Sequence, residues 1–185
     1  MQETKCNSTT LGQTLTKAWL GSKIVAVDAL GASGGLTIAW DERAITLTNI
    51  HANHHFIQAT FHIIGTNVHG HLTNVYFPQE AVNKIDILNT LTLINSTRIH
   101  PLWITRGDFD MITKLEEKKE GMNKLDSESI HLNNFIQNNW LIDMPFNNGI
   151  YTWNNRRTRT HQITSRLDRF LLSDNAIHLG GDIST

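Results

Sequence analysis

The segment from Trp103 to Asp110 joins an apolar strand to two closely spaced acids. Trp103-Ile104-Thr105 has the aromatic and β-branched composition of a buried strand, and Gly107-Asp108-Phe109-Asp110 follows it. A buried strand delivers these carboxylates to the rim of a sheet, which is a common place for metal and phosphate chemistry. A surface turn after a core strand has the same composition. The function of the pair therefore depends on the segments that accompany it.

Strands dominate the rest of the pattern. Apolar and polar residues alternate from Phe56 to Ile63, which indicates a half-buried strand, and turn residues at Asn67–Gly70 predict a hairpin with the next strand. The predicted strands cover residues 24–27, 36–40, 56–63, 72–77, 102–105, 150–153 and 166–172.

Two segments have the spacing of amphipathic helices. The apolar positions of the two helices are Ile85, Leu88, Leu91 and Ile94 in the first, and Leu132, Phe135, Ile136 and Trp140 in the second. Asp126 or Ser127 is a suitable N-cap for the second helix, and a highly charged loop, 114–124, precedes it. Several strands covered by two helices predict a mixed α/β or α+β layered fold.

Size and composition indicate one globular domain spanning residues 1–185. The formal net charge is -1, so no overall positive field points to nucleic acid. Cys6 is the single cysteine, which excludes an internal disulfide and fits a reducing compartment. No apolar run reaches about 18 residues, and the N-terminus lacks the apolar core of a signal peptide. We expect an intracellular, soluble protein that does not span a membrane, and a monomer.

Positive charge is concentrated near the C-terminal end. Residues 154–169 contain Arg156, Arg157, Arg159, Arg166 and Arg169 against one acid, Asp168. Such a segment is suited to phosphate groups, and a solvated loop has the same composition. The histidine cluster at residues 51, 54 and 55 has no standard zinc spacing.

Three further polar residues have both a functional and a structural interpretation. Glu3 is either a metal ligand or an exposed terminal acid, and Tyr76 either donates to a phosphate or packs in its strand. Asp168 lies in an otherwise apolar strand, where a carboxylate needs a partner. That partner is either a neighbouring arginine or a catalytic histidine that Asp168 orients.

These segments, in this order, resemble one protein family. The matching segments are Gln2–Lys5, Ser33-Gly34-Gly35-Leu36, Asn74-Val75-Tyr76-Phe77-Pro78, Gly107–Asp110, Tyr151–Asn155 and Arg166–Leu171. Together they resemble the endonuclease domain of plant non-LTR retrotransposons, within the endonuclease/exonuclease/phosphatase superfamily that includes DNase I and exonuclease III-type enzymes. The resemblance covers nearly the whole chain.

The resemblance implies a fold, a reaction and a set of site residues. It implies a four-layered α-β-β-α sandwich and hydrolysis of phosphodiesters with Mg²⁺ or Mn²⁺, which nicks DNA and leaves a 3′-hydroxyl. The resemblance assigns Glu3 to metal binding, Tyr76 to phosphate contact and Thr152 to substrate contact. It assigns Asp108 to the activation of water, Asp110 to the place of an asparagine that stabilises the transition state, and Asp168 to the orientation of the catalytic histidine. Three further residues are candidate substrate contacts: Asn74, on the strand face of Tyr76, and the arginines Arg156 and Arg157.

The sequence departs from the family pattern in two respects. The family's first strand and its closing Ser-Asp-His motif have no counterpart, so we expect a copy truncated at both ends. Asp110 also stands where the family has an asparagine. An ionised aspartate only accepts hydrogen bonds and repels phosphate, at a cost of about 2 to 4 kcal/mol if one stabilising donor is lost.

We therefore expect a retrotransposon-derived, DNA-nicking endonuclease domain whose activity is weak or absent. A nuclear location follows if the protein acts on DNA. Two alternatives stay open: a non-catalytic remnant that binds nucleic acid through the arginine segment, and another phosphoesterase of the same superfamily.

Overall fold

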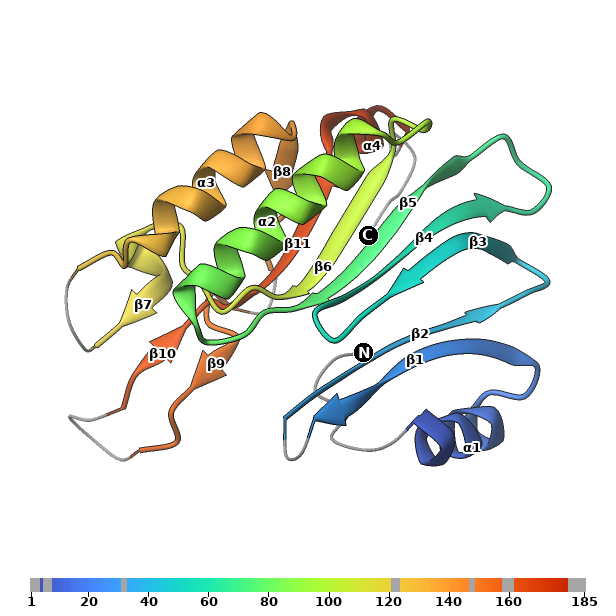
Figure 1. Cartoon of the computed structure of the whole chain (residues 1–185), viewed down its shortest axis with the longest axis horizontal. Coiled ribbons are helices and arrows are strands. Elements are labelled where there is room, and N and C mark those ends of the chain that lie inside the picture. Colours follow the sequence, from blue (N-terminus) through green and yellow to red (C-terminus); the bar gives the residue numbers. More distant parts are fainter. Residues whose placement is uncertain are drawn as a thin grey trace. The chain divides into compact units, whose positions relative to one another are not determined.

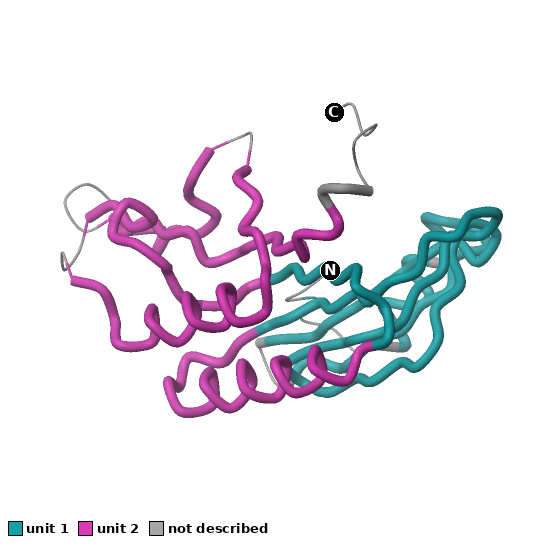
Figure 2. Tube along the Cα trace, turned by 90° about the horizontal axis from the view of Figure 1, so that it is seen from above, with its two compact units in different colours: residues 1–76, 99–107 teal, residues 77–98, 108–185 magenta. Residues whose placement is uncertain are grey.

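The computed structural model describes residues 4, 8–30, 33–120, 124–146, 149–157 and 162–179. These residues group into two compact units, coloured separately in Figure 2. Unit 1 comprises Met1–Tyr76 and Ile99–Gly107, and unit 2 comprises Phe77–Arg98 and Asp108–Thr185. The single domain expected from the chain length stays a prediction.

Unit 1 is built mostly of strands (Figure 1). Its elements are α1 (Ser8–Ala18), β1 (Ser22–Leu30), β2 (Ser33–Asp41), β3 (Ile45–Ala52), β4 (Phe56–Ile63), β5 (His69–Tyr76) and β6 (Trp103–Asp108). Strands β1 and β2 form a two-stranded ribbon, and β3, β4 and β5 form consecutive antiparallel pairs. β6 lies beside β5, where the N–H of His71 donates to the carbonyl of Leu102 at 2.8 Å.

The core of unit 1 lies between its two sheets. Leu36 and Ile38 of β2 are buried against Ile57 of β4, and Tyr76 of β5 packs against this cluster. The strand predicted at residues 56–63 forms as β4. The prediction that it is half-buried is wrong, because successive residues face opposite sides of a strand and residues 56–59 are all buried.

Unit 2 combines helices with short strands. Its elements are α2 (Ala81–Ser96), a 3₁₀ turn (Leu115–Glu117), β7 (Lys118–Lys119), α3 (Glu128–Asn138), β8 (Leu141–Asp143), β9 (Trp153–Asn154), β10 (Thr164–Ser165), β11 (Asp168–Ser173) and α4 (Asp174–Leu179). β8 pairs with β11, and β10 pairs with both β7 and β9, all antiparallel. None of the helices among the described residues has the length and apolar character needed to cross a membrane.

The predicted mixed α/β fold is confirmed, and most predicted elements exist. Both amphipathic helices form, and the strands at residues 24–27, 36–40, 72–77, 102–105 and 166–172 correspond to β1, β2, β5, β6 and β11. The strand predicted at 150–153 is wrong for most of its length, because only Trp153 of that range belongs to a strand. Its apolar residues, such as Ile150, are exposed.

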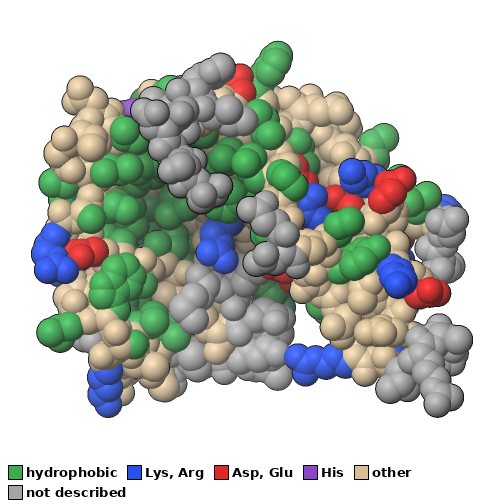
Figure 3. Space-filling view, turned by 180° about the vertical axis from the view of Figure 1, so that it is seen from behind, with side chains coloured by type: hydrophobic (Ala, Val, Ile, Leu, Met, Phe, Trp, Pro, Cys, Tyr) green, Lys and Arg blue, Asp and Glu red, His purple; other side chains and the backbone are tan. Residues whose placement is uncertain are grey.

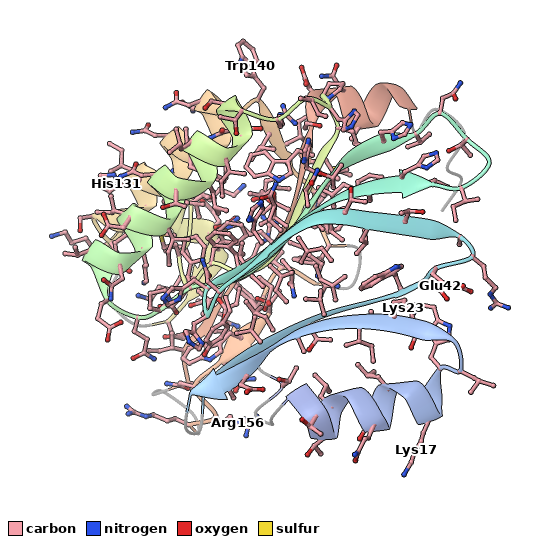
Figure 4. The ribbon with its side chains drawn as sticks, turned by 45° about the vertical axis from the view of Figure 1, so that its right-hand side comes forward. Lys17, Lys23, Glu42, His131, Trp140 and Arg156 are labelled. Carbon is pink, nitrogen blue, oxygen red and sulfur yellow. The ribbon has the colours of Figure 1, made fainter. Side chains whose placement is uncertain are left out.

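The prediction that Trp140 lies on the apolar face of α3 is also wrong. The helix ends at Asn138, and Trp140 follows in the left-handed conformation with φ of 53°. Its side chain is 75% exposed and projects away from the fold (Figure 4). Periodicity alone does not locate the end of a helix, so the predicted helix extended two residues beyond its actual end at Asn138.

Candidate active site

The two acids at the end of β6 form a tight turn in unit 2. The N–H of Asp110 donates to Oδ1 of Asp108 at 2.8 Å, and Asp110 has a left-handed φ of 48°. Phe109, between them, is fully buried, and Met111 and Ile112 directly after the turn are buried as well. These apolar anchors hold the backbone, so the half-buried carboxylate of Asp108 has a fixed orientation.

Two more predicted site residues lie next to this turn. The N–H of Phe109 donates to the carbonyl of Leu167 at 3.0 Å, which joins the turn to the start of β11. Oγ1 of Thr152 accepts hydrogen bonds from the N–H groups of Leu167 and Asp168, both at 3.0 Å. The structure therefore brings Asp108, Asp110, Thr152 and Asp168 together within unit 2. The Thr152 hydroxyl keeps its own proton available for donation.

A buried lysine contacts the same turn. Lys84 of α2 is 3% exposed, and its Nζ lies 2.9 Å from Oδ2 of Asp110 and 2.8 Å from the carbonyl oxygen of Asp110. Glu128, in the first turn of α3, lies 3.5 Å from the same nitrogen. An open cavity of about 380 Å³ in unit 2 borders these groups and also Lys118 and Trp153.

Asn74 and Tyr76 occupy alternate positions of β5 in unit 1. Asn74 is buried, and its Nδ2 donates to the carbonyl of Thr37 at 3.3 Å. Tyr76 is half-buried in the core cluster of unit 1, with its ring beside Gly34. Both residues thus have packing or hydrogen-bonding roles within their own unit.

The arginines of residues 154–169 divide into two kinds. Arg156 and Arg157 are exposed after β9, and the side chain of Arg156 points outward in Figure 4. Arg169 is 1% exposed, and the Arg166 side chain is 11% exposed. The predicted continuous basic segment is therefore wrong for Arg166 and Arg169, which are enclosed in unit 2. Arg159 lies outside the described residues.

Both enclosed arginines form ion pairs with two acids that the sequence did not single out. Nη1 of Arg166 and Nη1 of Arg169 each lie 3.0 Å from Oε1 of Glu117, and both arginines also contact Asp143. Burial alone would raise the pKa of Glu117. Hydrogen bonds from Arg169 and from the N–H of Thr113 outweigh it and lower that pKa from 4.5 to about 2.

The described residues do not provide a metal site by themselves. No group of three or more His, Cys, Asp or Glu side chains that could hold a metal ion is found in the described part of the chain. Glu3, which the resemblance assigns to metal binding, lies outside the described residues. On the face drawn in Figure 3, charged side chains of both signs are mixed over unit 2.

Sequence reasoning missed Lys84, Glu117 and Glu128. A signal existed for Lys84, because it precedes Leu88 by four residues and Leu91 by seven and so falls on the buried stripe of α2. Glu117 gave no such signal. It belongs to the segment 114–124, which was predicted to be a highly charged loop, yet its side chain is 1% exposed.

The comparisons with known proteins define the class of fold. No protein-family model and no curated protein matches the chain. Solved structures match over most of its length, and among them is an endonuclease/exonuclease/phosphatase family protein from Bacteroides thetaiotaomicron. That structure has a TM-score of 0.60 and 12% identity over 88% of this chain and 64% of the other. The chain therefore has the fold of endonuclease/exonuclease/phosphatase proteins.

Two further solved structures with this fold are a retrotransposon endonuclease domain and a protein bound to DNA. The endonuclease domain of TRAS1, a telomere-specific non-LTR retrotransposon, matches with a TM-score of 0.65 and 14% identity over 95% of this chain and 83% of that one. D. rerio TDP2, solved with a single-strand DNA product, matches with a TM-score of 0.56 and 14% identity over 94% and 70%. These similarities confirm the DNase I-like fold predicted from the sequence.

Proposed function

We propose that this chain is a phosphodiesterase domain that nicks DNA and leaves a 3′-hydroxyl, and that it derives from a non-LTR retrotransposon. The observation that carries the proposal is the cluster of Asp108, Asp110, Thr152 and Asp168, held by hydrogen bonds between the end of β6 and the start of β11. The likeness to TRAS1 supports the same class of reaction.

Each residue of the cluster has a proposed task. Asp108, fixed by the N–H of Asp110, takes a proton from the attacking water, and Thr152 donates to a phosphate oxygen. Asp168 orients a catalytic histidine. Mg²⁺ or Mn²⁺, with Glu3 as a proposed ligand, would supply positive charge on a phosphate oxygen. A nuclear location accompanies a DNA substrate.

The test is a nicking assay on supercoiled plasmid with Mg²⁺ or Mn²⁺. We expect slow conversion to open circles, and Asp108→Asn should lower the rate at least about 100-fold, the usual value of a general base. Asp86→Asn, at an exposed acid of α2, is the matched control and should leave the rate unchanged. Extension of the nicks by a DNA polymerase reports the 3′-hydroxyl. Nicking that survives Asp108→Asn would overturn the assignment.

A second function is favoured by the exposed pair Arg156 and Arg157. In this alternative the chain binds DNA without cutting it. Replacing both arginines by glutamine should then weaken binding of any duplex and lower the slope of log affinity against log salt by about 1 for each lost phosphate contact. Lys17→Gln, at an exposed position of α1, is the control. The alternative fails if no DNA binds at low salt.

A further inference from the structure

The ammonium group of Lys84 has a partner for each of its protons. Its Nζ lies 2.9 Å from Oδ2 of Asp110, 2.8 Å from the Asp110 carbonyl oxygen and 3.5 Å from Oε2 of Glu128. An ammonium has three N–H donors, so these three oxygens match it in number. Two of them belong to Asp110, at the shorter distances. Asp110 is thus the main partner of a lysine that is almost fully buried.

The backbone of Asp110 needs the support that this contact gives. Its φ of 48° is left-handed, a conformation that costs most residues about 1 to 2 kcal/mol and that, after glycine, Asn and Asp tolerate best. In this conformation its N–H reaches Oδ1 of Asp108. Lys84 bonds the carbonyl of the same residue and therefore closes the turn from the other side. The bond from the Asp110 N–H orients Asp108 directly, and the bond from Lys84 supports the turn.

The same contact changes the electrostatics of the turn. Asp108 and Asp110 are two residues apart, and their carboxylates repel each other unless a cation is present. Lys84 supplies that cation, within contact distance of Asp110. The charge of the aspartate that replaces the family's asparagine is therefore offset inside the protein, whereas the lost hydrogen-bond donor is not.

We propose that Lys84 is a positioning residue for the nicking reaction: it neutralises Asp110 and holds the Asp108–Asp110 turn, which allows an aspartate to replace the asparagine. This inference rests on the proposed function. Lys84 acts through Asp110, since its three donors already have partners in unit 2. It follows that the need for Lys84 is greatest while residue 110 carries a negative charge.

The experiment compares Lys84→Met, Asp110→Asn and the double variant. Asparagine keeps the shape and the left-handed tolerance of aspartate without its charge. We expect Lys84→Met to slow nicking about tenfold or more and the double variant to return to within about threefold of the wild type. Lys84→Arg should retain part of the rate. The matched control, Lys84→Met with Glu128→Gln, removes the more distant acid and should stay slow.

A second readout does not require activity. Hydrogen exchange of the Asp110 N–H, which is bonded to Asp108, should accelerate in Lys84→Met and recover in the double variant with Asp110→Asn. If the wild type does not nick DNA, the proposed function fails and exchange alone decides the role of Lys84. Equal impairment of the single and double variants, in either measurement, would show that Lys84 is only a packing residue and overturn the inference.

Discussion

Glu117 and Arg169 form a two-point ion pair in which neither side chain reaches solvent. Nη1 of Arg169 donates to Oε1 of Glu117 at 3.0 Å, and Nη2 donates to Oε2. The two side chains are 1% and 0% exposed. The pair fixes the 3₁₀ turn against β11. Arg169 follows Leu167 by two residues, and the carbonyl of Leu167 accepts the hydrogen bond from Phe109 that holds the Asp108–Asp110 turn. It therefore supports the proposed active site from within unit 2.

This pair predicts a loss of stability in acid. The pKa of Glu117 is lowered to about 2 in the folded protein from 4.5, so folding favours its ionised form. The stabilisation is complete above pH 4.5, decreases as the unfolded state begins to take up the proton, and is lost once the pH falls through about 2. Urea denaturation at a series of pH values measures this change.

Glu117→Gln is the matching variant. It leaves two buried arginines with fewer acceptors, so we expect it to cost about 3 to 5 kcal/mol of unfolding free energy at neutral pH. The stability difference between wild type and variant should shrink from pH 4.5 to about 2. Glu116→Gln, one position earlier in the same turn, is the control. A constant difference across that range would contradict the linkage.

Thr152 offers a second prediction, on the connection between β9 and β11. Its Oγ1 accepts from the N–H groups of Leu167 and Asp168, and Thr152→Val removes this acceptor while keeping the shape. Water can replace part of the loss because Thr152 is exposed, so we expect a cost of about 1 kcal/mol. Thr152→Ser should retain the stability.

Hydrogen exchange separates this role from a general loss of stability. The Leu167 and Asp168 amides should exchange faster in Thr152→Val than in Thr152→Ser. Unchanged protection of both amides would mean that the hydroxyl does not anchor this segment.

Periodicity predicted where the longer strands and helices lie. The alternation of residues 56–63 gave β4, and the spacing of Ile85, Leu88 and Leu91 gave α2. Asp108 and Asp110 were placed at the end of a buried strand because that strand is apolar, and the structure puts them there. These features depend on the spacing of apolar residues within one element, and that spacing can be read from the sequence.

Other features depend on partners that are distant in the sequence. Glu117 is buried because Arg166 and Arg169, about 50 residues later, enclose it, and no local pattern reports that pairing. Short strands such as β9 and β10 form through their pairing with one another. The effect of Asp110 was predicted without Lys84, which lies in another element, so the predicted repulsion lacked its counter-charge.

Stacked histidines in unit 1 yield a third prediction. The ring of His69 stacks on His62 at 4.2 Å and on His100 at 5.2 Å. Desolvation, followed by repulsion from His62 and His100, lowers the pKa of His69 below 6.5. Because the folded state favours the neutral ring, the free energy of unfolding should decrease as the pH falls below 6.5. The decrease ends once the pH is below the pKa of His69 in the folded protein.

An NMR titration of the imidazole protons tests this prediction. His62→Gln removes one stacked neighbour and should raise the pKa of His69, whereas His131→Gln, at an exposed position of α3, should not change it (Figure 4). A pKa of His69 at or above 6.5 in the wild type would be incompatible with the stack.

Trp140 provides the last prediction, because its backbone and its side chain are both unfavourable. Its φ of 53° is the conformation that glycine adopts best after a helix, and its side chain is 75% exposed. Trp140→Gly should therefore stabilise the protein by about 0.5 to 1 kcal/mol, measured by urea denaturation. Trp140→Ala keeps the strain and removes the same ring, so it should give no gain. If both variants lose stability equally, the indole ring makes a packing contribution that its exposure does not indicate.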